Sequence, residues 1–179
     1  MTPFVILGAA SLVLATLRRL RVALVMAVVA AIFYVDGHGI HLAANSIGAD
    51  PISPPSAAAR AYFFDERLGH IEWHAGWIGL LAAFVVAESR RTPIRPLFAI
   101  GTAGLLGPIL AAITIEGQTW WLVLGATPVF VLAAVRRRGH VSVACAASLT
   151  LAALVIVAWA IWWGGLPQIT EVVGARLSA

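Results

Sequence analysis

The segment VALVMAVVAAIFYVDGHGIHLAANS, residues 22–46, sets the class of fold for this chain. Its first fourteen residues are apolar, and about 20 mostly apolar residues are enough to cross a bilayer as a helix. Four polar residues then follow within ten positions: Asp36, His38, His41 and Asn45. Because polar side chains are costly inside a membrane and are generally functional there, the segment predicts a membrane helix that carries a site.

The composition of the whole chain supports a membrane protein. Of its 179 residues, 61% are hydrophobic and only 11% are charged, and the mean hydropathy is +0.93. These values lie outside the range of soluble globular domains. The chain has no flexible linker, low-complexity tract or convincing internal repeat, which predicts a single domain over residues 1–179. We therefore expect an all-α, polytopic integral membrane helical bundle.

Six apolar segments are candidates for spanning helices. The first has neither a positively charged start nor a small-residue cleavage site, which favours a retained helix over a signal peptide. The last is followed by a tail at residues 164–179. The six segments cover approximately residues 2–17, 22–46, 57–89, 96–115, 119–135 and 141–163.

The basic residues predict how these helices are oriented. All twelve are arginines, and nine of them fall in three clusters between apolar segments, a topological pattern rather than a nucleic-acid-binding face. Because arginines gather on cytoplasmic connections, both termini and the 164–179 tail are predicted on the extracytoplasmic side of the cell membrane. The clusters are Arg18, Arg19 and Arg21; Arg90, Arg91 and Arg95; and Arg136, Arg137 and Arg138.

A second polar segment, YFFDERLGHIEWHAGW, occupies residues 62–77. The Pro- and Ser-rich loop before it is short, so the helices at 22–46 and 57–89 are predicted to be antiparallel neighbours. At 100° per residue, each helix presents its polar residues on one face. Counting about 1.5 Å per residue from the cytoplasmic ends puts four histidines in one layer, at about 21 to 28 Å. The two stripes are His38, His41 and Asn45 on one helix and Glu66, His70 and His74 on the other.

Several imidazoles and carboxylates in one layer predict a transition-metal site, since clustered His and acidic residues hold metals. Imidazole nitrogen and carboxylate oxygen suit zinc, iron, copper or manganese. The single cysteine, Cys145, excludes a disulfide or a cysteine-based zinc site within the chain, and the lack of thiolates argues against an iron–sulfur or blue-copper centre. The predicted ligands are His38, His41, His70, His74 and Glu66.

Glu66 is predicted to be either a fifth ligand or the catalytic base. The segment HIEWH at 70–74 differs from the zincin motif HExxH, because Glu72 lies two positions after His70, about 200° round the helix. Glu66 precedes His70 by one turn and shares its face. Side chains expected to orient imidazoles or bind water are the further catalytic candidates Asp65 and Asn45, together with Asp36 and Glu72.

The leading hypothesis is a metal-dependent enzyme that hydrolyses a lipid or another apolar small molecule entering from the bilayer. The alternative enzyme is an iron or copper oxidoreductase that activates oxygen, or an accessory subunit of one. A lone histidine in a membrane helix more often has a packing role, so the hypothesis depends on the joint pattern.

Two other classes of function stay open. A haem-binding electron carrier would use one histidine from each helix, for which His41 and His70 are placed. A metal-ion transporter is less favoured, because the last three predicted helices have almost no polar residues in their inner halves. A homo-oligomer or a partner membrane subunit also stays open, since a bundle this small has difficulty enclosing a substrate alone.

Overall fold

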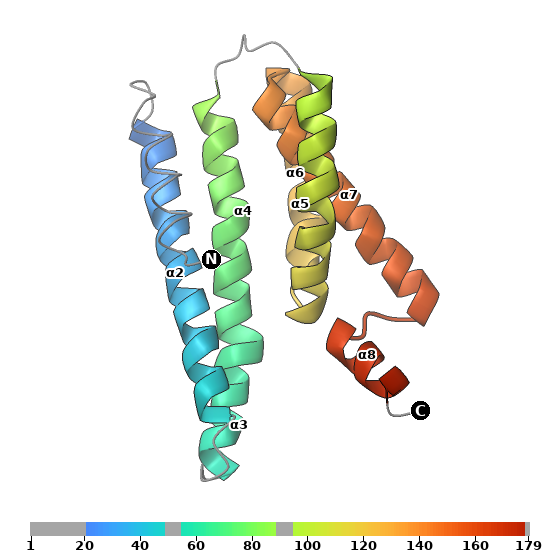
Figure 1. Ribbon diagram of the computed structural model, residues 1–179. Helices are drawn as coiled ribbons and strands as arrows, with labels where there is room; N and C mark the ends of the chain where they lie inside the picture. The colour runs from blue at the N-terminus through green and yellow to red at the C-terminus, as the bar shows by residue number, and fades with distance from the viewer. Residues whose placement is uncertain (1–20, 49–54, 89–94, 178–179) are drawn as a thin grey trace. The chain divides into compact units, whose positions relative to one another are not determined.

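The computed structural model describes residues 21–48, 55–88 and 95–177, which are all-α (Figure 1). Five helices within these ranges are long and apolar enough to cross a membrane, which confirms the predicted all-α bundle. The predicted helix at 2–17 lies outside the described residues, and the sidedness of the termini stays a prediction. The five helices are Arg21–Ile47, Pro55–Ala87, Pro96–Glu116, Trp120–Arg137 and His140–Trp163.

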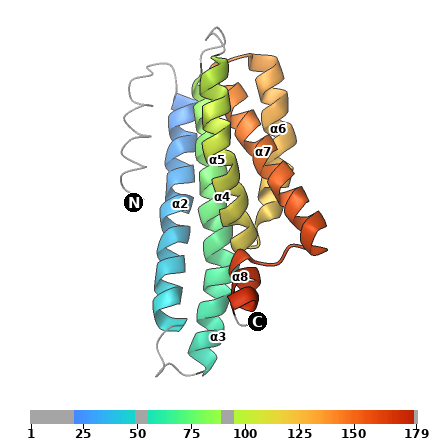
Figure 2. The same cartoon turned by 45° about the vertical axis from the view of Figure 1, so that its right-hand side comes forward.

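Contacts divide the chain into two compact units, Met1–Ala83 and Phe84–Ala179. In the first unit, the helix Arg21–Gly48 runs beside a second helical segment (Figures 1 and 2). This second segment begins at Pro55 and continues without a break to Ala87, a few residues into the second unit. The single domain expected from the sequence stays a prediction. The first unit contains α2 (Arg21–Gly48), α3 (Pro55–Phe63), η1 (Phe64–Gly69) and most of α4 (His70–Ala87).

The η1 segment is a π-helix inserted in the otherwise α-helical rod. At its end the His70 amide donates a hydrogen bond to the Asp65 carbonyl, five residues back instead of four. The sequence predicted one regular helix at 57–89. Instead, one turn of that helix holds an extra residue, and the faces before and after it are rotated relative to each other.

The inward positions of α2 repeat with a seven-residue period. Their spacing of four and three residues in alternation is typical of helix pairs that cross at a shallow angle. Most of the positions hold small residues, which lets two membrane helices approach closely. They are Ala23, Ala27, Ala30, Tyr34, Gly37, His41 and Ala44, of which all but His41 are buried.

Glycines bring the two helices of this pair into backbone contact. A Cβ built on Gly76 would lie 2.5 Å from the Tyr34 nitrogen. A Cβ on Gly37 would overlap the backbone of Trp73 and would lie 2.6 Å from the Gly69 oxygen. Since a real Cβ does not tolerate such distances, the close approach requires glycine at both positions.

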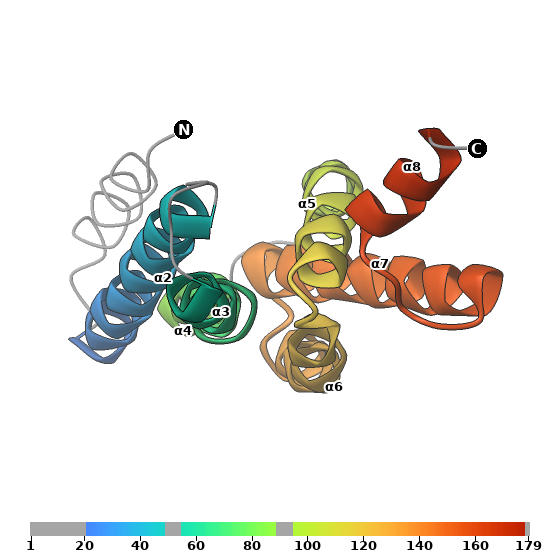
Figure 3. The same cartoon turned by 90° about the horizontal axis from the view of Figure 1, so that it is seen from below.

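The second unit is built on α7, which packs against both α5 and α6 and lies between them when seen from below (Figure 3). Its buried face includes Leu149, Ala152 and Ile156. The predicted bounds of the three spans agree with the observed ones within two residues. These helices are α5 (Pro96–Glu116), α6 (Trp120–Arg137) and α7 (His140–Trp163), followed by α8 (Ile169–Leu177).

Two glutamates in this unit cap helices that are distant in sequence. The Glu88 side chain is only 2% exposed and accepts hydrogen bonds from the Val141 amide at 2.6 Å and the Ser142 amide at 2.9 Å. These amides open α7, whose own cap position, Gly139, has no side chain. An anionic acceptor at a helix N-terminus satisfies free amides and opposes the positive end of the helix dipole.

Glu116 caps the start of the C-terminal helix, α8. Its carboxylate accepts from the Ile169 amide at 2.8 Å and the Thr170 amide at 3.2 Å, and also contacts the Thr170 hydroxyl. The Gln168 side chain donates to the Glu116 carbonyl at 2.7 Å. The tail predicted at 164–179 therefore includes a helix, α8, which is held against the end of α5.

Candidate metal centre

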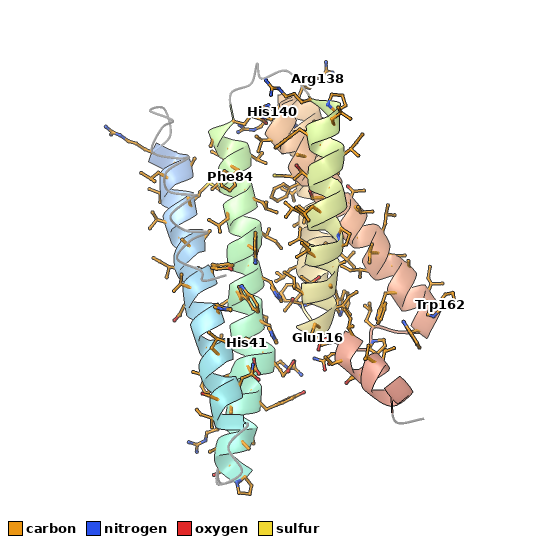
Figure 4. The ribbon with its side chains drawn as sticks, in the orientation of Figure 1. His41, Phe84, Glu116, Arg138, His140 and Trp162 are labelled. Atoms are coloured by element: carbon orange, nitrogen blue, oxygen red, sulfur yellow. The ribbon has the colours of Figure 1, made fainter. Side chains whose placement is uncertain are left out.

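Three side chains of the first unit come together between α2 and the η1 segment. His41, Asp65 and His70 each offer a ligand atom, and these atoms lie within 4.8 Å of one another. Figure 4 shows His41 on the side of α2 that faces the neighbouring helix. The His41 Nδ1 and Asp65 Oδ1 atoms are in direct contact, and the two imidazole centroids are 4.8 Å apart. The side chains of His41, Asp65 and His70 are 23%, 12% and 8% exposed, so all three are largely buried.

The π-helix explains why Asp65 belongs to this group. In a regular α-helix, residues five apart lie about 140° from each other. Here one turn contains five residues, and Asp65 comes onto the face that carries His70. Glu66, which the sequence favoured, lies next to this group, with its Oε2 atom 3.8 Å from His70 Nδ1.

Imidazole nitrogen and carboxylate oxygen are atoms that bind metal ions in proteins. Ligand distances of about 2.0 to 2.2 Å place neighbouring ligands of a tetrahedral ion about 3.3 Å apart. No pair of ligand atoms of His41, Asp65 and His70 exceeds that separation by more than about 1.5 Å, because all three lie within 4.8 Å of one another. The three residues therefore form a group that could hold one metal ion.

Other predicted residues surround the three. The Asn45 Nδ2 atom is 3.2 Å from His41 Nε2 and helps to orient that ring. His74 is 1% exposed, and its ring stacks on that of His70 at a centroid distance of 5.7 Å. The His38 ring is 6.4 Å from that of His41. Neither His38 nor His74 is within the compact group of three ligand atoms found in the described ranges.

The predicted acids Asp36 and Glu72 are next to each other rather than among the ligand atoms. The Asp36 carboxylate of α2 interacts electrostatically with the Glu72 carboxylate of α4. The remaining histidine, His140, belongs to the second unit, where its Nδ1 atom is 3.7 Å from Glu88.

Trp73 is a central residue of this cluster that the sequence reasoning missed. Its ring is 4.7 Å from that of His38, 5.4 Å from that of His41 and 5.3 Å from that of His74. Its position three residues after His70 was a usable signal, because residues three apart share a helix face.

Where the Trp73 ring contacts the His38 ring, two polar atoms have no hydrogen-bond partner in the described part of the chain. The Trp73 Nε1 and His38 Nδ1 atoms are both buried and form no hydrogen bond there. A buried donor without an acceptor costs about 1 to 3 kcal/mol. Such a cost is typical of functional sites, where a ligand or a small rearrangement completes the hydrogen bonding.

Comparison of the chain with protein-family models, with curated proteins and with solved structures found no match.

Proposed function

We propose that this chain is an integral membrane metalloenzyme that holds one transition-metal ion with His41, Asp65 and His70. The observation that carries the proposal is the convergence of two imidazoles and one carboxylate, from two neighbouring helices, to within 4.8 Å. Polar groups of this kind are costly in a bilayer. Joint binding of one ion would explain why these groups converge.

Three protein ligands favour catalysis over a structural role. Structural zinc sites are usually closed by four protein ligands, whereas catalytic sites keep a position open for water or substrate. Two imidazoles and a carboxylate match the ligand type of zinc hydrolases. A bound ion would supply Lewis acidity that polarises a substrate bond or activates water.

Glu66 is the proposed general base. Its carboxylate is 3.8 Å from the ring of His70, so it lies beside the ligand group. In hydrolysis, the oxygen of water bonds to the electrophilic atom of the substrate while the bond to the leaving group breaks. Glu66 would take the proton from water and return it to the leaving group.

The depth of the group favours an apolar or lipid-like substrate. His41 lies twenty residues from the start of α2, about 30 Å along the axis, and His70 lies about 26 Å from the end of α4. These distances approach the thickness of the hydrocarbon core, about 30 Å. A lipid could therefore present a bond near its headgroup to this group while its acyl chains stay in the bilayer.

A second candidate function is oxygen-dependent oxidation of an apolar substrate. The specific observation is again the donor set, since two histidines and one carboxylate also hold iron(II) in oxygenases. Metal identity separates the two functions. The haem hypothesis is disfavoured, because backbone contact at Gly37 leaves no space for a porphyrin between the helices.

The test is elemental analysis of the purified protein in a mild detergent, for the wild type and the His41→Ala and His70→Ala variants. We expect about one zinc or iron per wild-type chain and a loss of most of it in both variants. His140→Ala is the matched control, because it removes a histidine that lies outside the ligand group. Full metal content in His41→Ala and His70→Ala, or equal loss in His140→Ala, would rule out the proposed ligands.

A further inference from the structure

A groove lies between the end of α2 and the start of the rod beside it. Its volume is about 470 Å³, and its lining is almost entirely apolar. The groove is distinct from the metal ligands, none of which lines it. Its apolar walls are formed by Ile40, Ala44 and Ile47 of α2, Ala57 and Ala61 of α3, and Phe64.

The groove has a polar end and an apolar end. Ser56 lies at the first turn of α3 and opposite the last turn of α2, where Ile47 contributes to the wall. Phe64 and Ile40 lie about 10 Å further along the helices. Since the rod from Pro55 to Ala87 is about 50 Å long, it exceeds the hydrocarbon core of about 30 Å. The Ser56 end is therefore the one nearer the headgroup layer, and the Phe64 end is the one nearer the acyl chains.

Arg60 supplies the charge at this groove. It lines the groove and is exposed, and no carboxylate among the described residues pairs with it. The long stem of an arginine packs on apolar surface while its guanidinium extends to the headgroup level, where it binds phosphate with two parallel hydrogen bonds. The groove thus combines a cation near the headgroups with a channel for a hydrocarbon chain.

We propose that this groove binds one anionic phospholipid of the surrounding bilayer. The phosphate lies at Arg60 and Ser56, and one acyl chain follows the apolar walls toward Phe64. The excess positive charge of Arg60 selects an anionic headgroup over a zwitterionic one. This site does not depend on the metal-binding function.

The test uses protein reconstituted in bilayers of equal parts phosphatidylglycerol and phosphatidylcholine and then transferred to a mild detergent. Native mass spectrometry counts the lipids that stay bound. We expect one retained phosphatidylglycerol per wild-type chain. In Arg60→Gln, retention of this lipid should fall about tenfold, because a charge-assisted phosphate contact is lost. Arg67→Gln is the matched control, since Arg67 is also exposed but does not line the groove.

A second pair of variants tests the channel rather than the charge. Ala43 lines the groove and is exposed, so Ala43→Phe fills it without disturbing a buried contact. Leu42→Phe, at an exposed neighbour outside the lining, is its control. We expect lipid retention to be lost in Ala43→Phe and kept in Leu42→Phe.

Three results overturn the proposal. The first is equal retention of phosphatidylglycerol in Arg60→Gln and Arg67→Gln. The second is unchanged retention in Ala43→Phe. The third is a wild-type dimer that becomes monomeric in Ala43→Phe, which would make a second copy of the chain the occupant of the groove.

Discussion

Replacing Gly37 by alanine tests whether close contact between α2 and its partner helix holds the candidate ligands together. The added Cβ would overlap the backbone of Trp73 and would lie 2.6 Å from the Gly69 oxygen. Ordinary contact begins at 3.4 Å. The helices must therefore separate by at least 0.8 Å at this level, the difference between the two distances.

The same displacement would move the candidate ligands His41 and His70 apart. His41 follows Gly37 by about one turn, and His70 directly follows Gly69. Ligand distances in metal sites vary by only about 0.2 Å, so a separation four times larger distorts the site strongly. We expect zinc affinity to fall about 10- to 100-fold, as it does when the support of a ligand is lost. Overpacking should also destabilise the helix pair by about 1 to 3 kcal/mol.

The assay is competition for zinc against a fluorescent chelator in detergent. Gly39→Ala is the matched control, because it makes the same change two residues along α2 and its Cβ would meet nothing within 4 Å. Zinc affinity should be unchanged in this control, with a slight gain in helix stability. If Gly37→Ala binds zinc as tightly as Gly39→Ala, the helix contact does not set the geometry of the ligands.

Three further predictions concern carboxylates. Asp65→Asn should lower zinc affinity at least about tenfold in the same titration, whereas Glu66→Gln should keep the ion; the reverse result would make Glu66 the ligand. Glu88→Gln should lower the free energy of unfolding by about 2 kcal/mol, because one backbone amide of α7 would face an NH₂ group. Its Tm should fall by about 4 to 8 °C. An unchanged melting curve would contradict this role. Glu116→Ala should speed amide hydrogen exchange in residues 169–177 about tenfold, measured by mass spectrometry; equal protection would show that α8 is held by other contacts.

The extents of the spanning helices could be predicted because apolar runs and their interruptions determine them. Pro96 begins α5, and the arginines at 136–138 end α6. The helix α8 was missed because its stability depends on Glu116, more than fifty residues earlier. Contacts at that separation leave no periodic signal in the sequence.

The candidate site could be predicted in part. Helical periodicity and a short loop were enough to place His41 opposite His70, because both arguments depend only on regular geometry. The same reasoning assumed 3.6 residues per turn throughout. It therefore favoured Glu66, whereas the π-helix brings Asp65 onto the ligand face. The central place of Trp73 was missed because an aromatic residue in a membrane helix is usually interpreted as packing.

His41 occupies one position of the seven-residue repeat with which α2 packs, between Gly37 and Ala44. Under the proposed function, binding of the ion and association of the two helices would be a single thermodynamic event, because the free energy of coordination also opposes their separation. A chain without the bound ion would have a less stable helix pair and would be degraded sooner. The cell's supply of the ion would thus control how much of the protein persists, as well as how much of it is active.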